Sequence, residues 1–267
     1  MKTAILSISA GVALLVTGFI AIDSNTVADN YKVIKVDGKI TYVKSGKDLL
    51  TGDLFASNEK LTFGTQESRA AVISSVNGRF VLTPDAKGGS ASNLLPAMSN
   101  VATRSGALIN ALDLKNHFSE NYLLLEEMEL KINSEVYPMD KDNFFYLQYE
   151  LNGESIPKKL NFHDDVLELT AKEIYTVDGK SLPIPEKTKM AIYYRNNSIK
   201  KSTKISEFFL ISPNSENLKL ELGVILDELK AKDSETKTNE ITAYLYEFYG
   251  KPQKENLKDW LSKNMSL

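Results

Sequence analysis

Polar and apolar positions alternate in the first part of the chain, and this period is typical of β-strands. The alternation predicts strands at Tyr31–Val36, Lys39–Val43, Leu61–Phe63, Ala70–Ile73 and Arg79–Leu82. Asp37-Gly38 and Asn77-Gly78 separate neighbouring strands, and Asx-Gly pairs favour two-residue hairpin turns. We therefore expect Lys39–Val43 to pair with Tyr31–Val36 in a small all-β domain that spans residues 31–86.

A second stretch of alternation, at residues 122–212, predicts six or seven further strands. They are Glu129–Asn133, Phe144–Leu151, Ile156–Phe162, Val166–Thr170, Glu173–Val177, Met190–Tyr194 and Glu207–Ile211. Turn signals such as Asn152-Gly153 recur about every 8–12 residues or slightly more, which is typical of a β-sandwich. We predict a sandwich of immunoglobulin-like architecture, without the cysteine–tryptophan core of true immunoglobulins.

After residue 212 the apolar spacing changes to that of amphipathic helices. The apolar positions are Leu218, Leu222, Ile225 and Leu229, then Ile241, Tyr244, Leu245 and Phe248, and last Leu257, Trp260 and Leu261. We predict two or three helices in residues 213–267, packed on each other, on the sandwich or on a partner. Tyr246, Tyr249 and Trp260 are of types enriched at protein interfaces, and they are our candidate partner-binding residues.

Residues 87–121 connect the two β regions. Lys87–Asn93 is rich in glycine and serine, a composition typical of linkers. Leu108, Ile109 and Leu112 have the spacing of a short helix packed on a sheet. His117 follows beside Phe118, and we expect it to be a packed or capping residue. The predicted fold is thus mainly β, with helices at the end and more than one domain.

Residues 1–28 resemble a targeting segment. Met1-Lys2 is followed by 20 uncharged residues from Thr3 to Ile22, and Thr26-Val27-Ala28 offers small residues for cleavage before Asp29. We expect a signal peptide that directs the chain to the periplasm or cell envelope. The alternative is an uncleaved anchor with a single membrane span, because the apolar run is about as long as a bilayer is thick.

Composition restricts the chemistry of the protein. The chain of 267 residues has no cysteine, which excludes disulfides, thiolate zinc sites, iron–sulfur clusters and cysteine nucleophiles. It has two histidines, His117 and His163, so a site built from several histidines is nearly excluded. The net charge of −3 gives no indication of a nucleic-acid partner. We expect no cofactor.

The first β region also resembles the FecR-like domain. The similarity rests on the order and spacing of Val33, Val36, Gly38 and Ile40; Leu49, Gly52 and Asp53; Leu61; Ser68, Ala70 and Val72; and Asn77, Gly78, Arg79, Leu82 and Pro84. FecR-like domains are extracytoplasmic β modules of bacterial envelopes. The founding family relays a signal from an outer-membrane transporter to a cytoplasmic sigma factor.

The resemblance implies a binding module more than a complete signalling protein. The founding role uses a helical cytoplasmic region ahead of the membrane segment, and here Met1, Lys2 and Thr3 stand in that place. The matched residues Gly38, Gly52, Asp53, Gly78 and Pro84 are expected to be structural. In particular, we expect Asp53 to satisfy backbone N–H groups of a turn, as aspartates commonly do, and not to act in catalysis or bind a metal.

Two further groups of residues are candidate sites. His163-Asp164-Asp165 is the one acidic cluster with a histidine, but three adjacent residues are more consistent with a turn than with a metal site. The aromatic run Phe144, Tyr146, Tyr149, Tyr193 and Tyr194 offers a sugar-stacking face, although cross-strand packing explains most such runs.

No catalytic motif stands out in the sequence, so we predict a non-enzymatic envelope protein. Its partner is expected to be another envelope protein or cell-wall polysaccharide. One alternative is a transmembrane signalling component of FecR type. Another is a carbohydrate-active hydrolase, which would bring two carboxylates from distant strands to within about 5–10 Å in a cleft.

Overall fold

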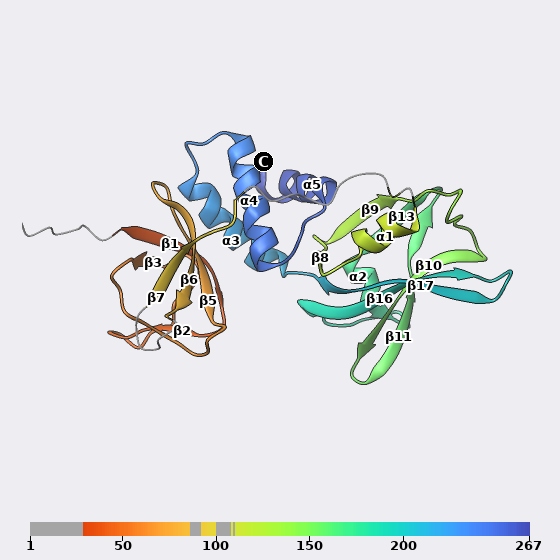
Figure 1. Cartoon of the computed structure of the whole chain (residues 1–267), viewed down its shortest axis with the longest axis horizontal. Coiled ribbons are helices and arrows are strands. Elements are labelled where there is room, and N and C mark those ends of the chain that lie inside the picture. Colours follow the sequence, from red (N-terminus) through yellow and green to blue (C-terminus); the bar gives the residue numbers. More distant parts are fainter. Residues whose placement is uncertain (1–28, 86–91, 100–107, 109) are drawn as a thin grey trace, which may run out of the picture.

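The computed structural model describes residues 29–85, 92–99, 108 and 110–267 (Figure 1). The predicted signal peptide or anchor, residues 1–28, lies outside this set. Within the described part, two β-rich units are followed by three helices, which confirms the predicted fold class. No helix among these residues is both long and apolar enough to cross a membrane.

The N-terminal module comprises the first seven strands. They are β1 (Asn30–Asp37), β2 (Ile40–Tyr42), β3 (Leu54–Ala56), β4 (Leu61–Phe63), β5 (Arg69–Ser74), β6 (Gly78–Pro84) and β7 (Ser92–Pro96). Five of them form an antiparallel sheet in the order β3-β1-β5-β6-β7, and β2 pairs with β4. One face of the five-stranded sheet covers a small core that includes Val33, Phe55 and Leu82.

Two predictions for this module are wrong. The segment Lys39–Val43 does not pair with β1, because β1 uses its two edges for β3 and β5. The chain instead bends sharply at Gly38, where φ is +78° and an added Cβ would lie 2.6 Å from Ser68 Oγ. Part of the predicted linker is also a strand, since Ser92–Pro96 adds to the sheet edge beside β6. The hairpin around Asn77-Gly78 is confirmed by the pairing of β5 with β6.

The second unit is a sandwich of two sheets. Its strands are β8 (Asn121–Leu123), β9 (Glu127–Lys131), β10 (Asn143–Leu151), β11 (Glu154–Lys159), β12 (Asn161–His163), β13 (Val166–Thr170), β14 (Thr176–Val177), β15 (Lys180–Ser181), β16 (Lys187–Asn196) and β17 (Lys201–Ile211). The larger sheet has the order β11-β10-β16-β17-β8, and the smaller sheet has the order β12-β13-β9. Leu147 from the larger sheet and Leu130 and Leu167 from the smaller sheet share one core.

Two short helices belong to the sandwich. Helix α1 (Ala111–His117) lies within the predicted linker and packs against β17, which confirms a short helix on a sheet. The predicted packing face is wrong, because Leu108 precedes the helix and bridges to Ile132, and Leu112 is 63% exposed. Asn110 caps it by accepting hydrogen bonds from the backbone N–H groups of Leu112 and Asp113. Helix α2 (Ala171–Ile174) replaces the first two residues of the strand predicted at Glu173–Val177, whose last two residues form β14. The buried side chains of Ala171 and Ile174 fill the sandwich core at this point, and a helical turn places both of them inward.

The C-terminal helices are α3 (Ser215–Glu228), α4 (Ser234–Phe248) and α5 (Lys254–Met265), and they confirm the helical spacing of the sequence. They pack on each other and on the free face of the N-terminal module, where Ile34, Ala71 and Ile73 meet them. The same cluster reaches Leu123 and Leu125 of the sandwich region. Figure 1 shows the helices between the two β units, with α3 and α4 beside the first and α5 towards β9. The last part of the chain therefore joins the two β units.

Candidate functional site

The residues of the FecR-like pattern lie in turns and at a strand end. Gly38, Gly52 and Gly78 have positive φ angles of 78°, 89° and 79°, a backbone conformation that favours glycine. Pro84 is the last residue of β6. Asp53 Oδ2 accepts a hydrogen bond of 2.9 Å from the backbone N–H of Leu50, which is the turn role expected for it.

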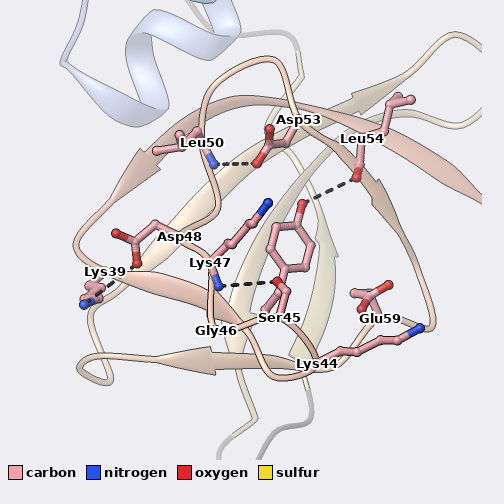
Figure 2. A pocket seen from close by; sticks show the side chains of 11 residues that line it. Lys39, Lys44, Ser45, Gly46, Lys47, Asp48, Leu50, Asp53, Leu54 and Glu59 are labelled. Carbon is pink, nitrogen blue, oxygen red and sulfur yellow. Dashed lines mark hydrogen bonds and ion pairs between the residues drawn. The ribbon is translucent and has the colours of Figure 1, made fainter.

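A hollow of about 910 Å³ opens on the N-terminal module beside these turns (Figure 2). We call it the Tyr42 hollow; it is lined by Lys39, Tyr42, Lys44, Ser45, Gly46, Lys47, Asp48, Leu50, Asp53, Leu54 and Glu59. Three lysines and three carboxylates balance its charge. The Tyr42 hydroxyl donates a hydrogen bond of 3.4 Å to the carbonyl oxygen of Leu54. Burial, together with the nearby Asp53 and Glu59, raises the pKa of Tyr42.

The cluster His163-Asp164-Asp165 is a turn. His163 and Val166 are opposite each other in the pairing of β12 with β13, and Asp164 between them has a φ of 50°. His163 Nδ1 lies 2.8 Å from Glu168 Oε1, and this hydrogen bond raises the pKa of His163. Asp165 pairs instead with Lys131 at 3.3 Å. His163 and Asp165 thus have separate partners, and the cluster does not converge on one point.

The predicted aromatic face is divided between the two sides of the larger sheet. Tyr149 and Tyr194 point into the sandwich core, where they are 3% and 9% exposed. Phe144, Tyr146 and Tyr193 lie on the opposite face and are half-buried. The rings of Tyr146 and Tyr193 stack at 5.1 Å across β10 and β16. Cross-strand packing explains the run, and three of its five rings form an outer aromatic face.

The candidate partner-binding residues do not form one surface. Tyr249 and Trp260 are each 3% exposed and belong to the core between the helices and the N-terminal module. Tyr246 is half-buried on α4. The prediction of a partner surface is therefore wrong for Tyr249 and Trp260, because their aromatic rings contribute to the protein's own packing.

Tyr249 takes part in a buried polar cluster where the module meets the helices. The hydroxyl groups of Tyr244 and Tyr249 donate to Glu221 Oε2 at 2.6 and 2.7 Å. Lys35 Nζ from β1 donates to the Tyr249 hydroxyl at 2.9 Å and lies 3.6 Å from Glu221 Oε1. Burial raises the pKa of Glu221, although Lys35 and the two tyrosines act in the opposite direction. No local sequence pattern indicates this cluster, because its members come from distant elements.

The substitution Glu221→Gln is expected to change how stability depends on pH. Burial raises the pKa of Glu221 in the folded state above its ordinary value of 4.5, so folding favours the protonated acid. The stability of the unmodified protein relative to the variant is then greatest below about pH 4.5 and decreases as pH rises through the folded-state pKa. Urea unfolding of both proteins between about pH 4 and pH 8 measures this difference.

The matched control for this experiment is Glu216→Gln, on the same helix. The Glu216 side chain is 80% exposed, so the free energy of unfolding of this variant is expected to differ little from that of the unmodified protein. If the difference in stability between Glu221→Gln and the unmodified protein does not change with pH, the raised pKa of Glu221 is contradicted.

Comparisons with known proteins give no indication of function, so a functional proposal depends on the chemistry of the sites described above. No protein-family model matches the sequence. A search of curated proteins also finds no significant match.

Proposed function

We propose that the protein is an exported, non-enzymatic binding protein of a bacterial cell envelope, and that its N-terminal module binds cell-wall glycan in the Tyr42 hollow. The observation that carries the proposal is the composition of this hollow. One aromatic ring lies among lysines and carboxylates in equal number, in a depression that is open to solvent (Figure 2).

This composition fits a polar ligand that carries groups of both charge signs. An aromatic ring with a polar hydroxyl packs against the apolar C–H face of a sugar. Lysine and carboxylate side chains supply the hydrogen-bond donors and acceptors that sugar hydroxyls require. Peptidoglycan has sugar hydroxyls together with peptide stems that bear carboxylates and amines, so it matches both features.

The joined architecture supports a scaffolding role. Lys35 and Arg79 of the module make ion pairs with Glu221 and Glu247 of the helices, and Asn256 of α5 accepts and donates hydrogen bonds at Leu125 of the sandwich region. A ligand held by one β unit is thereby kept at a defined distance from the other unit.

Tyr42→Ala is expected to weaken binding to purified peptidoglycan sacculi at least about tenfold, a loss typical of removing a central aromatic contact. Cosedimentation of the exported chain with sacculi measures the affinity. Tyr193→Ala is the matched control, because it removes a half-buried tyrosine from the outer aromatic face of the sandwich.

Each result of that experiment has a definite meaning. If Tyr193→Ala loses binding and Tyr42→Ala does not, the glycan lies on the outer aromatic face and the assignment to the hollow fails. Wild-type affinity in both variants, or no binding of the unmodified protein, contradicts glycan binding by either surface. Release of soluble sugar by the unmodified protein would favour the hydrolase alternative.

Export is tested by mass spectrometry of the N-terminus of protein isolated from cells. The proposal expects a mature N-terminus near Asp23 or Asp29, in the periplasmic or envelope fraction. An intact Met1 in the inner membrane, recovered with a sigma factor, would favour the FecR-type signalling alternative.

A further inference from the structure

The outer face of the larger sheet is open to solvent in the part of the chain that the structure describes. Core residues such as Leu147, Ile192 and Phe208 point to the inner side of their strands, so the residues next to them in sequence point outward. Among the described helices, α1 makes the main contact with this sheet, and its residues Leu114 and Phe118 lie on the core side. No described helix therefore packs on the outer face.

The aromatic rings of this face extend beyond Phe144, Tyr146 and Tyr193. Phe209 of β17 is directly opposite Lys189 of β16 on the same face, and its residue is 39% exposed. In the described part of the chain, no hydrogen bond occupies the hydroxyl groups of Tyr146 and Tyr193. The face thus offers a ligand both apolar surface and two polar groups that donate and accept hydrogen bonds.

Positive charge surrounds these rings. The outward positions of β10, β11, β16 and β17 carry two carboxylates and five cationic side chains, namely Glu150, Glu207, Lys159, Lys187, Lys189, Arg195 and Lys204. This gives the face an excess of three positive charges, whereas the whole chain has a net charge of −3. Glu207 already pairs with Lys189 at 4.0 Å and with Lys204.

Three of the cations have no carboxylate partner among the described residues. Lys159 Nζ lies 4.4 Å from the centroid of the Phe144 ring, and Lys187 Nζ lies 4.4 Å from that of the Phe209 ring. The guanidinium of Arg195 hydrogen bonds to two neutral side chains. An aromatic ring attracts a cation but carries no net charge to neutralise it. These three positions therefore attract an anion from solution.

The spacing of these cations indicates an extended ligand. Lys187 and Arg195 are eight positions apart on β16, which corresponds to about 26 Å at the rise of a β-strand. A small anion cannot reach both ends of the face. The ligand that fits is a polymer with several negative charges.

The chemistry of the face distinguishes between three kinds of anionic polymer. An acidic peptide needs partners for its backbone N–H and C=O groups, which a sheet supplies at its edge and not on its face. A single-stranded nucleic acid stacks its bases on open aromatic rings. The rings of Tyr146 and Tyr193 instead stack on each other, with 11° between their planes. An acidic polysaccharide needs cations for its carboxylates and polar side chains for its hydroxyl groups, and this face supplies both.

We propose that the outer face of the larger sheet binds an acidic polysaccharide whose sugars carry carboxylates. The polysaccharide lies along β16, where its carboxylates pair with Lys159, Lys187 and Arg195. Its hydroxyl groups hydrogen bond with the hydroxyl groups of Tyr146 and Tyr193. This site is separate from the Tyr42 hollow and does not depend on glycan binding there.

Fluorescence polarisation of the full chain with a dye-labelled oligogalacturonate, in which every sugar carries a carboxylate, tests the proposal. We expect saturable binding that weakens as salt concentration rises, because the attraction is between charges at a solvent-accessible surface. The double substitution of Lys159→Gln with Lys187→Gln is expected to weaken binding about fivefold or more. The matched control is Lys172→Gln with Lys180→Gln, which removes two exposed lysines of the same unit that lie outside the four strands of the face.

Tyr193→Phe tests the hydroxyl group while keeping the stacked ring in place. We expect oligogalacturonate binding to weaken about threefold, the effect of losing one hydrogen bond. Urea unfolding of this variant is expected to match that of the unmodified protein, because the hydroxyl has no hydrogen-bond partner among the described residues.

Three results would overturn the proposal. The first is equal affinity of the two double variants for oligogalacturonate. The second is equal binding of a neutral dextran of the same length, which would show that the carboxylates are not recognised. The third is equal or tighter binding of polyglutamate or of oligothymidylate, which would assign the face to a peptide or a nucleic acid. The probe contains no peptidoglycan, so failure here is distinct from failure of the Tyr42 hollow.

Discussion

Arg79→Ala is expected to lower the free energy of unfolding by about 3–5 kcal/mol, the range for removing one partner from a buried ion pair. The Arg79 side chain is 1% exposed and donates to Glu240 Oε1 at 2.6 Å and to Glu247 Oε2. It also donates to the carbonyl oxygen of Met98 at 2.9 Å. Removal of the guanidinium leaves Glu247, whose side chain is 12% exposed, without its cationic partner.

Urea unfolding followed by circular dichroism measures this loss. Arg195→Ala is the matched control, because within the described part of the chain the Arg195 side chain hydrogen bonds only to Asn197 and Ser202, in contacts exposed to solvent. We expect it to cost less than about 1 kcal/mol. If Arg79→Ala costs no more than this control, the ion pairs of Arg79 do not hold the module on the helices.

Phe118→Ala is expected to cost a similar amount, about 3–5 kcal/mol, through a different mechanism. Phe118 is fully buried and follows α1, which packs on the larger sheet. Its ring lies 4.9 Å from the ring of Tyr122 and 5.3 Å from that of Phe208. Truncation leaves a cavity in the sandwich core that rigid strands on both sides cannot fill.

The same unfolding measurement tests this variant. Leu112→Ala on α1 is the control, because Leu112 is 63% exposed and its truncation is expected to change stability by about 0.5 kcal/mol or less. Equal effects of the two substitutions would show that Phe118 does not contribute to the core in the way described.

Local patterns predicted the secondary structure well where neighbouring residues determine it. The Asx-Gly turns at Asn77-Gly78 and Asn152-Gly153 both join paired strands, and the three C-terminal helices follow the spacing of their leucines. Strand partners were harder to predict. The pair Asp37-Gly38 has the chemistry of a hairpin turn, but β1 has its partners in β3 and β5, and this choice depends on the whole module.

The candidate sites could be predicted only in part. The alternation of β10 already separates Phe144 and Tyr146 from Tyr149, so the aromatic run could have been divided between two faces from the sequence. The buried polar cluster could not, because Lys35, Glu221 and Tyr249 are far apart in the sequence and only the fold brings them together. Trp260 illustrates the same limit: its residue type indicates an interface, but only the structure shows that its ring is buried within the chain.

The packing of α3 and α4 on β1 and β5 has a consequence for biogenesis. Ile34, Ala71 and Ile73 are covered by residues more than a hundred positions later in the chain, such as Leu222 and Ile241. In a chain that is synthesised from its N-terminus, this apolar face stays open until the last helices arrive. Chaperones and proteases therefore have time to recognise the nascent module, and a chain that stops before α3 is expected to be degraded even if its two β units have folded.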